Sequence, residues 1–150
     1  MLDVSKCERD SVAQSVLRRL DNLTGIPNEN MEHLQILRYN EGQQYANHYD
    51  FNQHEQERPQ GGRLLTAFLF LNDVVKGGET EFTSLPRPLQ VKPRCGKILI
   101  WPNVLDQDPD SMDKRTRHRA LPVQEGIKYA VNAWFHQRDF RRPHSLGCTA

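Results

Sequence analysis

The chain has 150 residues, enough for one domain with a sizeable hydrophobic core. Its formal net charge is +1, and 26% of its residues are charged, without a long run of one sign. This balance argues against a nucleic-acid-binding protein that relies on phosphate contacts and against a polybasic membrane surface. No apolar run reaches the roughly 18 residues of a transmembrane helix, and residues 1–10 lack the apolar core of a signal peptide.

The first predicted element is an amphipathic helix over residues 8–23. Apolar residues recur along it at helical spacing and form one stripe: Val12, Val16, Leu20 and Leu23. Gly25 and Pro27 then favour the end of the helix. We expect this helix to cover a sheet.

Short extended segments follow, separated by Gly and Pro. They are expected at residues 33–39, 44–50, 63–71, 79–82, 96–101, 116–121 and 127–136. The segment 63–71, RLLTAFLFL, is apolar almost throughout, which is typical of a strand buried on both faces.

Three polar segments are interpreted as irregular: 51–62 and 102–117 as surface loops, and 138–150 as a frayed tail. The chain shows neither a βαβ alternation nor an internal repeat. The sequence therefore predicts a mainly antiparallel β fold, sandwich-like or barrel-like, with one helix packed outside.

A possible metal site begins at His48 and Asp50. On an extended segment, residues two apart point to the same side, so these side chains offer a nitrogen and an oxygen ligand to one point. His118, on a later strand, would complete a set of two histidines and one carboxylate, the facial triad of non-haem Fe(II) oxygenases. A His-x-Asp pair alone is common by chance, and zinc accepts the same ligand types, so the surrounding pattern has to decide.

The last strand adds a second unusual feature. One of its faces carries Lys128, Ala130, Asn132 and Trp134, and the other, a core face, carries Ile127, Tyr129, Val131, Ala133 and Phe135. A cation among small and aromatic neighbours is costly unless it is paired. A dicarboxylate could bind the metal at one end and Lys128 at the other. The alternative is a lysine that reaches solvent at the start of the strand.

These motifs resemble the Fe(II)/2-oxoglutarate-dependent dioxygenases, specifically the prolyl 4-hydroxylase alpha-subunit-like group. The matching stretches are YNEGQQYANHYD (39–50), RLLTAFLFLNDVVKGGETEF (63–82), VKPRCGKILIW (91–101) and RHRALPVQEGIKYAVNAWFH (117–136). The resemblance implies a double-stranded β-helix (jelly-roll, cupin-like) core with a flanking N-terminal helix. It also implies a catalytic domain over 1–140 that lacks elements found upstream in the family, with 141–150 as a polar tail.

By this resemblance, the iron ligands and catalytic set are His48, Asp50 and His118. The cosubstrate side would comprise Lys128, which matches the lysine that binds the distal carboxylate of 2-oxoglutarate, together with Tyr39, Thr66 and Trp134. The substrate side would comprise Tyr45 and Arg63. The G-G-E-T turn at 77–80 is interpreted as structural. Cys95 and Lys97 depart from residues that are frequent in the family, at positions away from the proposed chemistry.

The resemblance also implies the cofactors and partners. The cofactors would be Fe(II), 2-oxoglutarate and O2, with ascorbate as reductant, and the reaction would hydroxylate proline in a peptide or protein while succinate and CO2 are released. A nucleic-acid partner is not expected. Two alternatives remain at this point: an oxygenase that acts on another residue or a small molecule, and a non-catalytic β-sandwich binding module. The oligomeric state and the compartment stay open, although the family resemblance is compatible with the secretory pathway.

The remaining histidines are predicted to be structural or exposed: His33, His54, His136 and His144. The three cysteines lie far apart and are expected to be reduced rather than zinc-bound: Cys7, Cys95 and Cys148. Asn22 begins the tripeptide Asn-Leu-Thr, which matches the N-glycosylation pattern.

Overall fold

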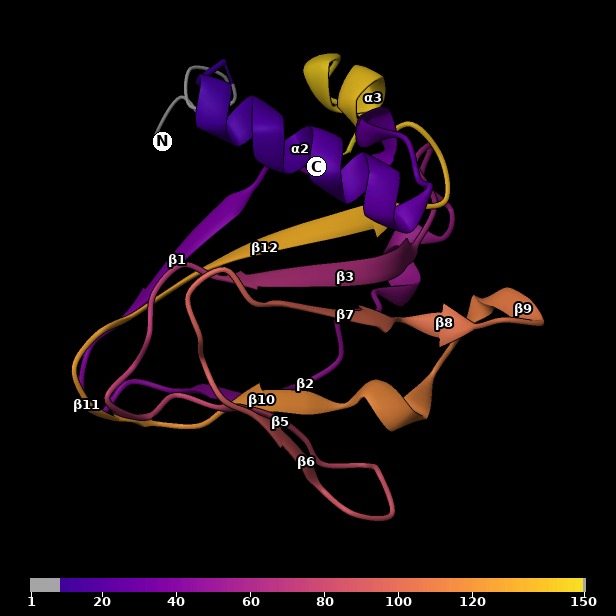
Figure 1. Ribbon diagram of the computed structural model, residues 1–150. Helices are drawn as coiled ribbons and strands as arrows, with labels where there is room; N and C mark the ends of the chain where they lie inside the picture. Colours follow the sequence, from indigo (N-terminus) through magenta and orange to yellow (C-terminus); the bar gives the residue numbers. More distant parts are fainter. Residues whose placement is uncertain (1–8, 150) are drawn as a thin grey trace.

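Two four-stranded antiparallel sheets face each other in the computed structural model, which describes residues 9–149 (Figure 1). The major sheet has the order β1 (Gln35–Tyr39), β12 (Lys128–His136), β3 (Arg63–Phe70), β7 (Ile98–Pro102). The minor sheet has the order β2 (Tyr45–His48), β10 (His118–Ala120), β5 (Thr80–Phe82), β6 (Leu89–Val91). The predicted jelly-roll core with a flanking helix is confirmed.

Smaller elements connect the sheets. Two strand pairs lie outside them: β11 (Val123–Glu125) with β4 (Lys76–Gly77), and β8 (Val104–Leu105) with β9 (Asp108–Met112). The helices are α2 (Ser11–Thr24), α3 (Arg141–Ser145) and the short 3-10 turns η1 (Asn28–Asn30), η2 (Gln53–Glu55) and η3 (Lys114–Thr116). Within residues 9–149, no helix is both long and apolar enough to cross a bilayer.

Helix α2 begins and ends where its capping residues satisfy the backbone. The Asp10 carboxylate accepts hydrogen bonds from the amides of Val12 and Ala13 at 2.8 and 3.4 Å. Gly25 ends the helix in a left-handed conformation with φ at 68°, and its amide donates to the carbonyl of Asp21. The predicted helix is therefore present, shifted by a few residues toward the C-terminus.

The buried stripe of α2 differs from the prediction. Leu17 and Leu20 are the buried residues of the helix, and they pack on the outer face of the major sheet (Figure 1). Val12 and Leu23 are 69% and 59% exposed, although both were expected in the stripe. They lie in the first and last turns, beyond the part of the helix that meets the sheet.

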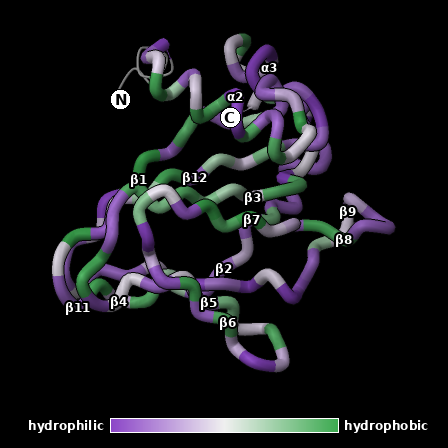
Figure 2. The backbone as a smooth tube through the Cα atoms, viewed as in Figure 1, coloured by the Kyte–Doolittle hydropathy of each residue, from purple (hydrophilic) through white to green (hydrophobic). Residues whose placement is uncertain are grey.

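Strand β3 is buried on both faces, as its apolar sequence predicted. Ala67 belongs to the core between α2 and the major sheet. Phe68 and Phe70 belong to a second core between the two sheets. Figure 2 shows the hydrophobic segments concentrated on the central strands of the major sheet. The second core also includes Phe82 of the minor sheet and so joins the two sheets.

The alternation expected for β12 holds over most of the strand. Ala133 and Phe135 pack under α2, and Ala130 faces the core between the sheets. Ile127 and Tyr129 are 37% and 38% exposed, however, although both were predicted for the core face. The buried cluster under α2 does not extend to this end of the strand.

Two polar segments are more ordered than predicted. Residues 102–117, expected to be a loop, contain the β8–β9 hairpin and η3. Part of the predicted frayed tail forms α3, whose His144 ring stacks on Phe140, and Phe140 stacks in turn on His136. These elements are held together by backbone hydrogen bonds and local ring contacts. Their side chains are mostly polar, so a search for hydrophobic periodicity does not detect them. Of the cysteines, Cys95 and Cys148 are free and exposed, while Cys7 lies outside the described residues.

Candidate active site

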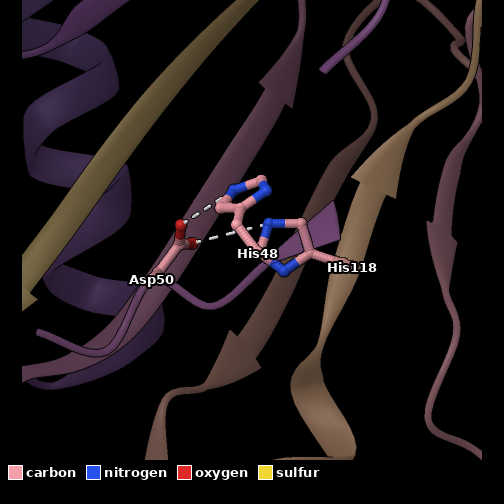
Figure 3. A group of neighbouring side chains, drawn as sticks. All are labelled: His48, Asp50 and His118. Carbon is pink, nitrogen blue, oxygen red and sulfur yellow. Dashed lines mark ion pairs between the residues drawn. The ribbon is translucent and has the colours of Figure 1, made fainter. Parts of the chain in front are cut away.

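Strand pairing brings the three predicted metal ligands together. His48 ends β2, and it is the direct cross-strand partner of His118 at the start of β10. Asp50 follows two residues after His48 and turns toward both rings (Figure 3). Its carboxylate oxygens lie 3.4 Å from Nε2 of His48 and 3.8 Å from Nε2 of His118. The three ligand atoms lie within 4.8 Å of one another, which suits one metal ion.

The two histidines are held in the same tautomer. Nδ1 of His48 lies 2.8 Å from the carbonyl oxygen of Ala46, and Nδ1 of His118 lies 2.9 Å from that of Thr116. A carbonyl oxygen only accepts, so each Nδ1 carries the proton of the neutral ring. Both Nε2 lone pairs are then directed to the Asp50 carboxylate and are available to a metal.

The charge states of the triad follow from burial and from mutual contact. Burial lowers the pKa of His118, which outweighs the attraction of Asp50 and favours the neutral ring. Burial acts the same way on His48, but its contact with Asp50 raises the pKa overall. Burial would raise the pKa of Asp50, whereas His48, His118 and Thr66 together lower it. An ionised carboxylate beside imidazole nitrogens is a donor set suited to a divalent cation.

The triad opens into a cavity of about 360 Å³ between the two sheets. Phe68 and Trp101 form an apolar part of its wall. The Trp101 ring meets His118 edge-on at 4.8 Å and packs against Phe82 at 5.4 Å. One end of the cavity is therefore lined by aromatic rings, and an apolar lining strengthens electrostatic interactions close to it.

Lys128 lies directly behind this lining and is 1% exposed. Its Nζ donates a hydrogen bond of 2.8 Å to the carbonyl of Gly78. The rings of Phe68, Tyr39 and Phe70 surround it, with centroids at 5.1, 5.4 and 5.4 Å from Nζ. Burial lowers the pKa of Lys128 to about 8. A carbonyl and three rings offset only part of the cost of a buried cation, so a carboxylate in the adjoining cavity would be stabilised here.

The G-G-E-T turn supplies this carbonyl. Gly77 and Gly78 both have positive φ, at 78° and 72°, and a Cβ on Gly77 would lie 2.3 Å from the carbonyl oxygen of Pro122. The turn therefore has the expected structural role, because its backbone conformation and close packing require glycine at position 77. Thr80 also lines the cavity, and it was not predicted as a functional residue. Thr80 and Phe82 are two residues apart on an extended segment and therefore point to the same side, which could have indicated that Thr80 faces the interior.

The predicted substrate residues lie at the same cavity. Tyr45 is 55% exposed, and its ring meets His48 edge-on at 4.5 Å. Arg63 stacks over Trp134 with its guanidinium carbon 4.0 Å from the ring centroid, and its Nε donates to Glu32 at 2.6 Å. Both predicted substrate residues line the cavity, and so does Trp134, which was predicted for the cosubstrate side. Glu32 was not singled out in the sequence.

Three further residues lie or pair differently from what the sequence predicted. Thr66, expected to line the cosubstrate pocket, lies behind Asp50 and is fully buried. Asn132, not predicted as functional, lines the cavity and donates through Nδ2 to Oε1 of Gln35 at 2.9 Å. His136, expected to be structural or exposed, is fully buried and pairs with Glu32 at 2.9 Å.

Comparison with known proteins places this site in a family. Residues 34–136 match the model of the 2OG-Fe(II) oxygenase superfamily, and the chain belongs to this superfamily. The family and the His-Asp-His triad together support Fe(II) and 2-oxoglutarate as metal and cosubstrate, rather than a zinc site. Within the superfamily, the chain is prolyl 4-hydroxylase-like.

Individual relatives support this placement. Prolyl 4-hydroxylase 5 of Arabidopsis thaliana is 34% identical over 88% of this chain and 51% of its own length. Prolyl 4-hydroxylase subunit alpha-2 of Gallus gallus is also 34% identical, over 89% of this chain and 25% of its own. The chain thus spans about half of the first relative and a quarter of the second.

Among solved structures, the viral collagen prolyl hydroxylase of Paramecium Bursaria Chlorella virus-1, in its 2OG complex, has a TM-score of 0.67 and 32% identity. The alignment covers 82% of this chain and 69% of the viral one. A Trichoplax adhaerens prolyl hydroxylase, solved with a hypoxia inducible factor peptide fragment, has a TM-score of 0.62 at 19% identity, over 90% of this chain and 61% of that one, and shows the shared fold.

Proposed function

We propose that residues 1–140 form the catalytic domain of an Fe(II)- and 2-oxoglutarate-dependent dioxygenase that hydroxylates proline within a peptide, with ascorbate as reductant. The supporting observation is the pairing of two complementary features at one cavity. The triad of His48, Asp50 and His118 can hold a divalent metal, and Lys128 is a buried cation without a carboxylate hydrogen-bonded to it among the described residues. A dicarboxylate that chelates the metal would satisfy Lys128 with its other end.

The protein's part in this chemistry is to bind and orient. Fe(II) with 2-oxoglutarate supplies the activation of O2, for which protein side chains have no equivalent. His48 and His118 would hold the metal through Nε2, and Asp50 through its carboxylate. All three ligands come from the minor sheet and the turn that follows β2, and a metal held by three protein ligands would keep positions free for the cosubstrate and O2.

The cosubstrate side is assigned to Lys128, Tyr39 and their neighbours. Burial raises the pKa of Tyr39, so its hydroxyl remains protonated and can donate to a carboxylate or keto oxygen. Thr80 adds a second hydroxyl to the cavity wall. Phe68 and Trp101 line this end and would keep water away from an ion pair between Lys128 and the distal carboxylate, which would strengthen it.

The substrate side is assigned to Tyr45, Arg63 and Trp134. Tyr45 is half exposed beside His48 and offers a ring to a prolyl residue. Glu32 fixes the Arg63 guanidinium over Trp134, so its remaining N–H groups can donate to the carbonyls of an extended peptide. A polyproline-type chain is already extended and pays little ordering entropy on binding, which suits such a groove.

The deciding experiment is Fe(II)-dependent turnover of 2-oxoglutarate across a panel of proline-containing peptides. We expect succinate formation to rise with one class of peptide, and that peptide to gain the mass of one oxygen atom on a prolyl residue. Matched peptides with alanine in place of proline should leave succinate at the uncoupled rate. Omitting ascorbate should shorten the burst of turnover without changing its initial rate.

His48→Ala is the control, because it removes one metal ligand from a partly exposed position. Turnover unchanged in this variant would contradict the proposal. Succinate formation stimulated by a small molecule, or by peptides without proline, would favour an oxygenase with another substrate. A folded protein that takes up no Fe(II) and is not stabilised by 2-oxoglutarate would favour a binding module.

A further inference from the structure

We propose that Asn103 is a positioning residue of the metal centre, which it supports through two separate arms. Its side chain fixes Asp50 by way of Thr66, and its main chain fixes the turn that carries His118. The inference rests on the proposed metal site and adds residues that do not touch the metal or the cavity. Asn103 follows β7 and is 1% exposed.

The first arm begins at the Asp50 carboxylate. Oγ1 of Thr66, which is fully buried on β3, lies 2.7 Å from Oδ2 of Asp50. An ionised carboxylate only accepts, so the single hydroxyl proton of Thr66 is donated to Asp50. This bond restricts rotation of the carboxylate and holds Oδ1 at 3.4 Å from Nε2 of His48.

Asn103 in turn restricts Thr66. Nδ2 of Asn103 donates to Oγ1 of Thr66 at 3.0 Å, so the hydroxyl accepts from Asn103 while it donates to Asp50. The alternative bond, from the Thr66 hydroxyl to Oδ1 of Asn103, is longer at 3.3 Å and competes for the same proton. A charged acceptor at 2.7 Å prevails over a neutral one at 3.3 Å. The three side chains therefore form a directed chain from Asn103 through Thr66 to Asp50.

The second arm runs through the backbone of Asn103. Its amide donates to the carbonyl of Leu64 at 2.7 Å, which ties it to β3, and its carbonyl accepts from the amide of Asp113 at 3.0 Å. The carbonyl of Asp113 accepts from Oγ1 of Thr116 at 2.8 Å. The carbonyl of Thr116 lies 2.9 Å from Nδ1 of His118 and sets the orientation of its ring. One residue thus supports two ligands that lie 68 positions apart.

This arrangement predicts a specific effect on the metal. Partners that orient a metal ligand typically contribute 10- to 100-fold in metal affinity, because without them the ligands must be ordered on binding. Loss of the Asn103 or Thr66 side chain should loosen Asp50 while β3 and the backbone arm remain. The effect should appear as weaker metal binding in the absence of any substrate.

The experiment measures the dissociation constant of Co(II), from its visible absorption, for the whole chain without 2-oxoglutarate or O2. We expect Thr66→Val and Asn103→Ala each to weaken binding 10- to 100-fold. Thr66→Ser keeps the hydroxyl and should bind as the wild type does. Because the two side chains act in series, the double variant should bind about as weakly as Thr66→Val alone.

Leu17→Ala is the matched control for a purely structural effect. It destabilises the core under α2 and removes only apolar atoms, so the hydrogen bonds of Thr66 and Asn103 keep their partners. We expect it to lower the melting temperature and leave the Co(II) dissociation constant unchanged. Thr66 and Asn103 variants that lower the melting temperature in the same way, with unchanged Co(II) binding, would overturn the proposal. Fully additive losses in the double variant would overturn the serial arrangement.

Parallel turnover assays separate this inference from the proposed function. If wild-type protein binds Co(II) but no peptide stimulates succinate formation, the proposed reaction fails and the Co(II) series still decides the role of Asn103. If wild-type protein hydroxylates proline peptides and the variants bind Co(II) normally, the positioning role fails and the reaction stands.

Discussion

The metal triad lines the cavity and Lys128 lies behind its aromatic wall, and the two regions satisfy their polar groups in opposite ways. At the triad, both Nδ1 atoms are bound to backbone carbonyls, and Oδ2 of Asp50 is bound to Thr66. At the pocket, a buried ammonium group has one neutral carbonyl as its hydrogen-bond acceptor and aromatic rings around it. The triad is held by hydrogen bonds within the protein, whereas Lys128 has no carboxylate hydrogen-bonded to it among the described residues, and the charge of Glu79 offsets only part of the effect of burial on its pKa.

This difference assigns different tasks to the two regions. A metal site needs fixed directions, because several ligands have to meet one ion at short distances. A carboxylate pocket needs a strong and selective driving force, which an incompletely compensated cation provides. Metal binding should therefore tolerate little change in the geometry of the triad. The ligand-free protein should become more stable when the charge of Lys128 is removed.

The largest expected effect comes from the triad. His48→Ala should reduce turnover more than about 100-fold, because losing a ligand costs more than losing a residue that only orients one. The measurement is succinate formation at saturating 2-oxoglutarate. His48 has a side chain 30% exposed, so circular dichroism should show an unchanged fold. Turnover close to the wild-type rate in this variant would contradict the view that the triad requires all three ligands in fixed positions.

The lysine pocket is tested by Lys128→Met, which keeps the stem and removes the charge. We expect the 2-oxoglutarate KM to rise on the order of 100-fold, since a buried charge-assisted hydrogen bond contributes about 1.5–3 kcal/mol. The ligand-free variant should be more stable than the wild type, because the cost of burying the cation disappears. Thermal melting with and without 2-oxoglutarate measures both effects. A less stable ligand-free variant would mean that the lysine is already compensated.

The pH dependence of the pocket sharpens the same point. The pKa of Lys128 is lowered from 10.5 to about 8 in the fold. Below pH 8, Lys128 is protonated in both the folded and the unfolded chain, so the full cost of burying its charge reduces the free energy of unfolding. Between about 8 and 10.5, the folded chain loses the proton first, so the stability of the ligand-free protein gains a contribution that rises with pH.

Binding of 2-oxoglutarate should change in the other direction. Only the protonated lysine pairs with a carboxylate, so the affinity should fall above pH 8 by up to about tenfold per pH unit. Thermal shift titrations from pH 7 to 9.5 measure this slope. Lys128→Met serves as the control and should show no such slope; an equal slope in both proteins would assign the titration to another group.

The smallest expected effect concerns the mouth of the cavity, outside both regions. Tyr45→Ala removes an exposed ring beside His48. We expect peptide turnover to fall about tenfold, comparable to the loss of one or two kcal/mol of aromatic contact. Uncoupled decarboxylation of 2-oxoglutarate should be nearly unchanged, because neither the metal nor Lys128 is affected. Equal losses in both assays would place Tyr45 in the metal or cosubstrate site instead.

Much of the site could be predicted because its signals are local. His48 and Asp50 are two residues apart, and period-2 alternation predicted that both point to one side. In the structure β2 ends at His48, and the turn that follows it brings Asp50 to the same point. The same alternation placed Lys128 and Trp134 on the inner face of β12. Thr80 follows the same rule, but it belongs to the G-G-E-T turn, whose sequence predicts a structural role.

Other features could not be predicted, because they depend on partners that are distant in the sequence. The segment 102–117 reads as a polar loop, yet Asn103 is nearly fully buried there and supports the metal site. Thr66 lies in an apolar run of the sequence. Only the folded structure shows that its hydroxyl binds Asp50, which follows β2 in the chain. The exposure of Val12 likewise depends on where α2 meets the major sheet.

The sequence by itself determined the fold class and the chemical identity of the metal ligands, since alternation and residue type are properties of short segments. The tertiary structure decided which groups hold those ligands in place and which charge lacks compensation. The physical reason is that hydrogen bonds and burial depend on which residues meet in space, and these residues are distant in the sequence. Asn103, Thr66 and Asp50 become a network only when β3, β7 and the segment after β2 are brought together.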